Sequence, residues 1–155
     1  MTGGGATSAV LYAEDDENDT FLMQRAFRQA EITNPLRVVE DGRSAMQYLA
    51  GEGPYADRQE HPAACLLLLD LKMPKVDGLE VLRQVKGDPN LRIMPVVMMT
   101  SSREEQDLVK SYELGVNSYL VKPVKFQRFV ESVRQLGVYW ALMNEPPPGT
   151  GPAAS

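Results

Sequence analysis

Cysteine, long apolar runs and clusters of basic residues are all scarce in this sequence. Cys65 is the only cysteine among 155 residues, so no intramolecular disulfide can form, and its apolar surroundings are typical of a buried small side chain. No run approaches the ~18 consecutive apolar residues of a membrane span, and the N-terminus lacks the basic-then-apolar pattern of a signal peptide. We therefore expect a cytoplasmic protein that does not enter a membrane.

The charge balance argues against a nucleic-acid-binding function. Sixteen Lys and Arg residues stand against 21 Asp and Glu residues, which gives a formal net charge of −5. No Lys/Arg cluster reaches the density of a nucleic-acid surface, so we expect no direct DNA or RNA binding. The hydrophobic content of 43% and the length of 155 residues suit one folded domain with a substantial core.

Compositional shifts divide the chain into three parts. Residues 1–8 are rich in Gly, Thr and Ser and are expected to form a flexible leader. Residues 144–155 are rich in Pro and Gly and are expected to form a disordered tail. Between them, residues 9–143 alternate strand-like apolar runs with helix-like segments.

This alternation predicts an α/β fold with a doubly wound, five-stranded parallel sheet and five helices. The expected strands cover residues 9–13, 36–39, 65–69, 95–99 and 118–121. The expected helices cover residues 18–29, 44–49, 78–86, 101–114 and a segment from 126 onward, with Gly115 just after the fourth helix. The pattern alone leaves the strand order open.

Polar side chains stand at the carboxyl ends of four expected strands. Glu14-Asp15-Asp16 follows the first strand, and the third, fourth and fifth strands lead to Asp70, Thr100 and Lys122. In a parallel sheet these ends meet at one edge, where open α/β folds bind ligands. Carboxylates, a hydroxyl and an ammonium group meeting there are what magnesium-assisted phosphoryl transfer onto an aspartate requires.

The paired acids Asp15 and Asp16 have two interpretations. Adjacent carboxylates suit a hard cation such as Mg²⁺, but they also suit the N-terminus of the helix that follows. Asp70 favours the cation, because a carboxylate after four leucines is costly unless it is paired. A divalent cation and Lys122 together would supply the necessary counter-charge.

The chain resembles the response-regulator receiver domain over roughly residues 9–138. The motifs that carry the resemblance are Asp15-Asp16, Asp70 with Met73-Pro74 and Asp77-Gly78, Thr100-Ser101, and Lys122-Pro123. The resemblance implies a flavodoxin-like receiver fold with strand order 2-1-3-4-5.

The resemblance also implies a role for each acidic residue. Asp70 would be the phosphoacceptor for a phosphoryl group from a sensor histidine kinase in a two-component phosphorelay. Asp16, Asp70 and the main-chain carbonyl of Lys72 would bind Mg²⁺ directly, and Asp15 would assist through water. The chain would catalyse only its own phosphoryl transfer and dephosphorylation, so we expect a signalling protein and not an enzyme.

A conformational switch is part of the same resemblance. Thr100 and Lys122 would bind the phosphoryl oxygens, and the inward movement of Thr100 would vacate space that Tyr119 enters. This movement would reshape the surface of the fourth helix, the fifth strand and the fifth helix.

Two further segments resemble the small stand-alone regulators that are paired with bacterial phytochromes and related sensor kinases. They are the loop of residues 51–64 and the segment 133–140 that runs into Asn144-Glu-Pro-Pro-Pro148. We expect a homodimer, formed through the surface of the fourth helix, fifth strand and fifth helix or through the C-terminal extension. Tyr139, Trp140 and Leu142 of this extension equally suit a segment that folds back onto its own subunit.

Some residues depart from the family pattern or bear on alternatives. Lys125 precedes the fifth helix, where a basic residue opposes the helix dipole. His61, the only histidine, is not expected to transfer phosphate.

Three alternative functions keep parts of this pattern. A pseudo-receiver scaffold would keep the fold without the chemistry. A phosphohydrolase would need a second acid where Lys72 stands, and a flavin phosphate would be repelled by Glu14-Asp15-Asp16.

Overall fold

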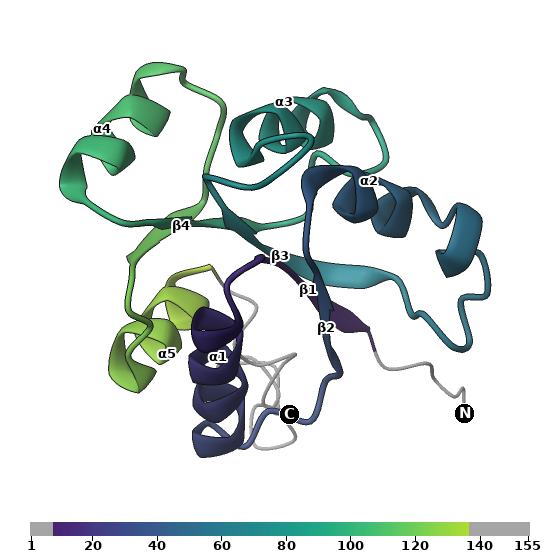
Figure 1. The fold of residues 1–155 in the computed structure, drawn as a ribbon, viewed down its shortest axis with the longest axis horizontal. Helices are drawn as coiled ribbons and strands as arrows, with labels where there is room; N and C mark the ends of the chain where they lie inside the picture. Colours follow the sequence, from purple (N-terminus) through teal and green to yellow (C-terminus); the bar gives the residue numbers. More distant parts are fainter. Residues whose placement is uncertain (1–7, 137–155) are drawn as a thin grey trace, which may run out of the picture.

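The core of the protein is a five-stranded parallel sheet (Figure 1). The structure is a computed structural model that describes residues 8–136. Its strands are β1 (Ala9–Ala13), β2 (Leu36–Val39), β3 (Ala64–Asp70), β4 (Val96–Thr100) and β5 (Ser118–Val121). They are arranged in the order β2-β1-β3-β4-β5, and all neighbours run parallel. The predicted strand order and strand ranges are therefore confirmed, with ends that differ by at most one residue.

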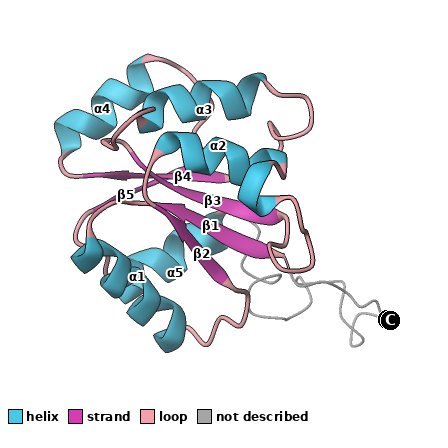
Figure 2. Cartoon of the chain, turned by 45° about the vertical axis from the view of Figure 1, so that its right-hand side comes forward, coloured by secondary structure: helices cyan, strands magenta, loops and turns pink. Residues whose placement is uncertain are grey.

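Helices cover both faces of the sheet (Figure 2). They are α1 (Glu17–Gln29), α2 (Gly42–Ala50), α3 (Gly78–Gly87), α4 (Arg103–Ser111) and α5 (Phe126–Gln135), and the 3₁₀ helix η1 covers Gly53–Tyr55. Helices α1 and α5 lie on one face, and α2, α3 and α4 lie on the other. None of these helices, within residues 8–136, has the length and apolarity that crossing a membrane requires.

Alternation along the strands builds a separate core on each face. In β1, Leu11 packs into the core under α2 and α3, whereas Val10 and Tyr12 pack into the core with α1 and α5. Successive side chains of a strand point to opposite faces, so a strand buried on both sides is apolar throughout. All five residues of β1 and of β4 are buried accordingly.

Short polar side chains fix where the helices begin. Asp16, Asp41, Asp77 and Ser102 each accept a hydrogen bond from the main-chain N–H three residues further on. Each of these bonds satisfies one N–H group that the first turn of a helix leaves unpaired. Lys125 stands at the same position of α5 and makes no such bond, as its side chain has no acceptor.

Helix α4 is shorter than predicted. It ends at Ser111, whereas the sequence pattern suggested residue 114 with Gly115 as the terminating glycine. Glu113 adopts a left-handed backbone conformation (φ 52°) and stops the helix before the glycine is reached. The expected leader, the dimer residues Tyr139, Trp140 and Leu142, and the expected tail lie outside the described residues, apart from Ser8.

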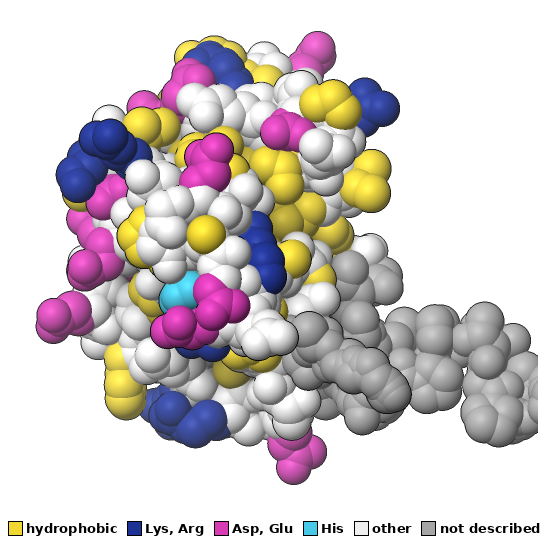
Figure 3. Space-filling model, turned by 90° about the vertical axis from the view of Figure 1, so that its right-hand side faces the viewer, with side chains coloured by type: hydrophobic (Ala, Val, Ile, Leu, Met, Phe, Trp, Pro, Cys, Tyr) yellow, Lys and Arg dark blue, Asp and Glu magenta, His cyan; other side chains and the backbone are white. Residues whose placement is uncertain are grey.

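The loop before β3 is held by aromatic and guanidinium contacts. The ring centroids of Tyr48 and Tyr55 are 5.0 Å apart, and those of Tyr55 and His61 are 5.3 Å apart. Arg58 donates hydrogen bonds to the main-chain carbonyls of Leu49 and His61. Figure 3 shows the histidine in cyan among charged side chains of both signs. This loop leads into the amino end of β3. His61 and Asp70, at the carboxyl end of β3, therefore lie at opposite ends of the strands.

One close backbone approach fixes the start of α3 against the end of β3. Gly78 donates its main-chain N–H to the carbonyl of Leu71 at 2.9 Å. A Cβ atom on Gly78 would lie 2.1 Å from the carbonyl oxygen of Asp70. Only glycine fits this contact, which positions the last residue of β3.

Candidate functional site

A lysine and three carboxylates meet at the carboxyl edge of the sheet. Lys122 directly follows β5, Glu14 directly follows β1, and Asp70 ends β3. The Lys122 Nζ lies 2.7 Å from Glu14 Oε1 and 3.1 Å from Asp70 Oδ1. It also lies 3.1 Å from Asp19 Oδ2, in the first turn of α1. The side chains of Glu14 and Asp70 are 0% and 7% exposed, so these are buried ion pairs.

Burial and like charge shape the ionisation of this group. Burial raises the pKa of Asp70, the Glu14 carboxylate raises it further, and Lys122 opposes both effects, so that the pKa lies at about 7. Burial alone would lower the pKa of Lys122, but the hydrogen bond to Glu14 and the charge of Asp70 outweigh it and raise the pKa. Lys122 is therefore a permanent cation at neutral pH.

Glu14 is a buried member of the site that the sequence analysis did not assign. Its Oε1 accepts a hydrogen bond from the Tyr12 hydroxyl at 3.0 Å, and burial together with Glu14 raises the pKa of Tyr12. The main-chain N–H of Glu14 donates to the carbonyl of Val39, so the strand pairing continues through this residue. Strand alternation then places Glu14 on the same face as Tyr12. This alternation could have distinguished Glu14 from the two acids that follow it.

The carboxylates that could share a cation are Glu14, Asp15 and Asp70. One oxygen of each lies within 4.8 Å of the others. Asp16 is not one of these three clustered residues. Its Oδ1 accepts a hydrogen bond from the Asp19 main-chain N–H at 2.9 Å, which caps α1. Of the two acids, Asp16 makes the helix-capping contact and Asp15 belongs to the carboxylate cluster.

Thr100 lies between the strands that carry Asp70 and Lys122. Its main-chain carbonyl accepts a hydrogen bond from the Lys122 N–H at 2.8 Å, and β4 pairs Asp70 with the neighbouring Met99. The Thr100 side chain is fully buried, and its hydroxyl has no hydrogen-bond partner among residues 8–136. A buried hydroxyl without a partner costs free energy, and a hydrogen-bond acceptor brought close to Thr100 would remove this cost.

The side chain of Lys72 pairs with a carboxylate outside the cluster of Glu14, Asp15 and Asp70. Its Nζ lies 3.0 Å from Glu105 Oε2, at the start of α4. Glu105 Oε1 also accepts a hydrogen bond from the Ser101 main-chain N–H at 2.8 Å. This ion pair joins the loop after Asp70 to the loop after Thr100.

Residues 10–134 match the family profile described as "Response regulator receiver domain". The chain belongs to the response-regulator receiver family.

Several relatives of this receiver are known. It is 38% identical over 147 residues to the probable methanogenesis regulatory protein FilR2 of Methanothrix harundinacea, covering 93% of this chain and 88% of FilR2. It is 37% identical over 131 residues to the response regulator Rcp1 of Synechocystis sp., covering 84% of this chain and 87% of Rcp1.

Solved structures agree with this assignment. The bacteriophytochrome response regulator RtBRR is 50% identical and superposes with a TM-score of 0.82, covering 94% of this receiver and 87% of RtBRR. The Mn²⁺-bound form of Rcp1 is 36% identical and superposes with a TM-score of 0.71, covering 91% of this receiver and 99% of that chain. The predicted family resemblance, including the likeness to phytochrome-type regulators, is confirmed.

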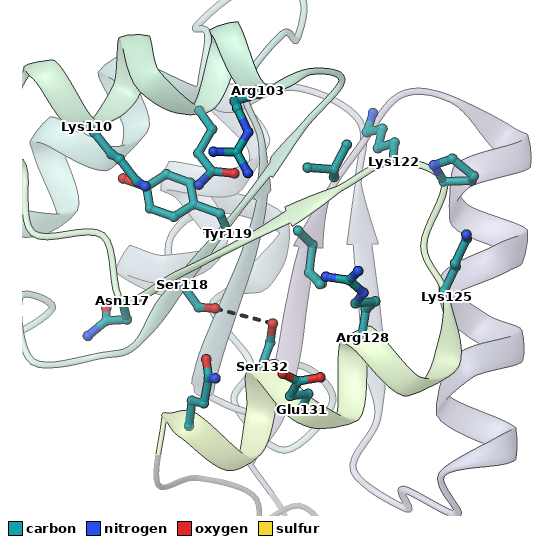
Figure 4. Close-up of a pocket in the computed structure, with 15 residues that line it drawn as sticks. Arg103, Lys110, Asn117, Ser118, Tyr119, Lys122, Lys125, Arg128, Glu131 and Ser132 are labelled. Carbon is teal, nitrogen blue, oxygen red and sulfur yellow. Dashed lines mark hydrogen bonds between the residues drawn. The ribbon is translucent and has the colours of Figure 1, made fainter.

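In this receiver, the expected switch residue Tyr119 lies beside α4 (Figure 4). It is in β5, opposite Met98 of β4. The Lys110 Nζ of α4 lies 5.3 Å from the centroid of its ring. Burial raises the pKa of the Tyr119 hydroxyl. Tyr119 is therefore half-buried, with its ring next to α4.

Proposed function

We propose that this receiver accepts a phosphoryl group on Asp70 from the phosphohistidine of a sensor histidine kinase. The observation that carries the proposal is the position of Asp70, buried at the end of β3 with the Lys122 ammonium 3.1 Å from its Oδ1. An ionised Asp70 oxygen forms the new bond to phosphorus while the bond from phosphorus to the imidazole nitrogen breaks. Lys122 stabilises the negative charge of the phosphoryl oxygens, so catalysis is by positioning and electrostatics.

A divalent cation fits the carboxylate group of this site. The oxygens of Glu14, Asp15 and Asp70 lie close together, and an all-oxygen donor set suits Mg²⁺. We propose that Asp15, Asp70 and the main-chain carbonyl of Lys72 hold Mg²⁺, with Glu14 adding negative charge next to them. The bound cation would supply charge neutralisation at the phosphoryl oxygens. The Mn²⁺-bound form of the related Rcp1 supports a divalent ion here.

The output of the phosphorylated state would be conformational. The buried Thr100 hydroxyl has no hydrogen-bond partner within residues 8–136. A phosphoryl oxygen on Asp70 would accept a hydrogen bond from it. Movement of Thr100 toward it would make room for Tyr119 beside β4. The surface formed by α4, β5 and α5 would change with the position of this ring.

Phosphorylation is tested by mass spectrometry after incubation with acetyl phosphate, or with a bacteriophytochrome-type kinase, in the presence of Mg²⁺. The wild-type chain should gain the mass of one phosphoryl group, and Asp70→Asn should gain none. Labelling of the Asn variant at the wild-type level would refute the assignment. Absence of labelling in the wild type with every donor would favour a pseudo-receiver scaffold.

The cation ligands are tested by a matched pair of variants in isothermal titration with Mg²⁺. Asp15→Asn removes one charged oxygen and should weaken binding at least roughly tenfold, the lower end of the loss for an outer-shell partner. Asp16→Asn keeps a good helix cap and should bind Mg²⁺ much like the wild type. The opposite order would restore Asp16 as the direct ligand.

The similarity to RtBRR supports a kinase of the bacteriophytochrome type as the partner. A homodimer through α4, β5 and α5 or through the C-terminal extension stays a prediction, as does the cytoplasmic location. Light scattering at low and high protein concentration tests the dimer, and a strict monomer would count against it.

A further inference from the structure

A groove with basic walls runs along β5, between α4 and α5 (Figure 4). Its volume is about 720 Å³. Arg103 and Lys110 line it from α4, and Lys125 and Arg128 line it from the start of α5. Glu131 is the one acidic residue among the described residues that line it. The groove is strongly basic on a chain whose net charge is −5.

Most of these cations lack a partner in the described part of the chain. Arg103, Lys125 and Arg128 are exposed, and none of the three forms a salt bridge within residues 8–136. Lys110 faces the Tyr119 ring instead of a carboxylate. Like charges gathered on facing walls repel one another and create a local positive potential. An anionic ligand would relieve this repulsion.

The floor of the groove is the edge of the sheet. Strand β5 pairs with β4 on one side and is the last strand in the order β2-β1-β3-β4-β5. Every residue from Asn117 to Pro123 lines the groove. The free side of an edge strand can pair with an added extended segment through main-chain hydrogen bonds.

We propose that this groove binds an extended, acidic segment of a partner protein, which lies along β5 with its carboxylates toward Arg103, Lys125 and Arg128. This proposal rests on the proposed function, in which α4, β5 and α5 form the surface that changes on phosphorylation. It adds the chemistry of the partner that binds there. Basic side chains at a sheet edge also protect against edge-to-edge aggregation. That protective role alone predicts no preference for acidic ligands, so binding experiments separate the two.

The test uses fluorescence anisotropy with the unphosphorylated full chain and a labelled peptide in which pairs of Glu alternate with pairs of Val, so that an extended strand carries Glu on both faces. The matched control peptide has Gln in place of Glu. The Glu peptide should bind at least about tenfold more tightly, which corresponds to about 1.4 kcal/mol, and added salt should weaken it. Hydrogen exchange should show protection of the β5 amides on binding. Equal affinity for both peptides, or β5 amides that stay unprotected, would overturn the proposal.

Matched charge reversals locate the site. Arg103→Glu with Arg128→Glu should reduce binding of the Glu peptide at least about tenfold. Arg43→Glu with Arg92→Glu changes the net charge equally at exposed positions outside the groove, and should retain binding. Equal losses in both double variants, with circular dichroism showing both folded, would refute a local site.

Other occupants give distinct results. A single-stranded oligouridine that binds more tightly than the peptide, and loses binding in the groove variant, would assign the groove to nucleic acid instead. Dimerisation abolished by the same variant, without peptide binding, would assign it to a second copy of this chain. Asp70→Asn should bind the peptide like the wild type, so failure of phosphoryl transfer would leave this result unaffected.

Discussion

Replacing Asp70 by Asn should stabilise the cation-free protein at neutral and alkaline pH, although the change removes a partner of Lys122. Burial and the Glu14 carboxylate raise the pKa of Asp70 from 3.8 to about 7. Between these two values the folded chain binds more protons than the unfolded chain. The free energy of unfolding therefore falls as the pH rises from about 4 to about 7, and the loss is complete above that range.

The size of the effect follows from the pKa. One pKa unit corresponds to about 1.4 kcal/mol, so ionising Asp70 costs folding on the order of 4 kcal/mol at pH 8. The pKa of about 7 already includes the attraction between Asp70 and Lys122, and Lys122 keeps Glu14 and Asp19 as partners in the Asn variant. We therefore expect a gain on the order of 4 kcal/mol at pH 8. For a chain of this length, that gain raises Tm by roughly 8–16 °C.

The assay is urea and thermal unfolding in EDTA, at about pH 8 and about pH 4. The stability gain should be present at the higher pH and close to zero at the lower one, where folded Asp70 is protonated. Asp107→Asn, at an exposed position of α4, is the matched control and should change little at either pH. A less stable Asp70→Asn variant at pH 8, or a gain that does not depend on pH, would show that the carboxylate repulsion is wrongly assigned.

Three further variants test the surroundings of the site in the same unfolding assays. Thr100→Val should stabilise the unphosphorylated protein by about 1 kcal/mol, because it removes a buried hydroxyl that lacks a partner within residues 8–136; a loss of stability would indicate that the hydroxyl is satisfied. Lys122→Met should destabilise the protein by about 3–5 kcal/mol at pH 8, since two buried carboxylates lose their counter-ion, and Mg²⁺ or low pH should recover part of the loss. Lys72→Met should cost at most about 1 kcal/mol, because Lys72 is 77% exposed in its ion pair with Glu105; a larger loss would mean that this pair holds the loops together.

Most of the architecture was accessible from the sequence, because its signals are local and strong. Apolar runs such as Leu66–Leu69 specify strands that are buried on both faces, and capping residues such as Asp77 mark where helices begin. The strand order came from the family resemblance, since apolar runs carry no information about which neighbour they pair with. The predicted end of α4 was wrong because Glu113 adopts a left-handed backbone conformation two residues before Gly115. Glutamate rarely adopts this conformation, so the sequence does not indicate it.

The site was only partly accessible for a different reason. The prediction that side chains at the strand ends meet is confirmed for Asp70 and Lys122, which form an ion pair. Among three consecutive acids, however, composition cannot distinguish the buried Glu14 from the helix cap Asp16. That distinction depends on where strand pairing stops and the helix starts, a matter of one or two residues. The pairing of Lys72 with Glu105 joins positions 33 residues apart and has no local signal.

The fit of Gly78 against the Asp70 carbonyl affects how mutational scans of this protein should be interpreted. Any side chain at position 78 must displace either the first turn of α3 or the end of β3 that carries Asp70. A screen for folded protein and a screen for signalling would therefore both reject substitutions there. Intolerance at this position reports a steric constraint between two segments of backbone, and is not a sign that the residue touches kinase, cation or phosphate.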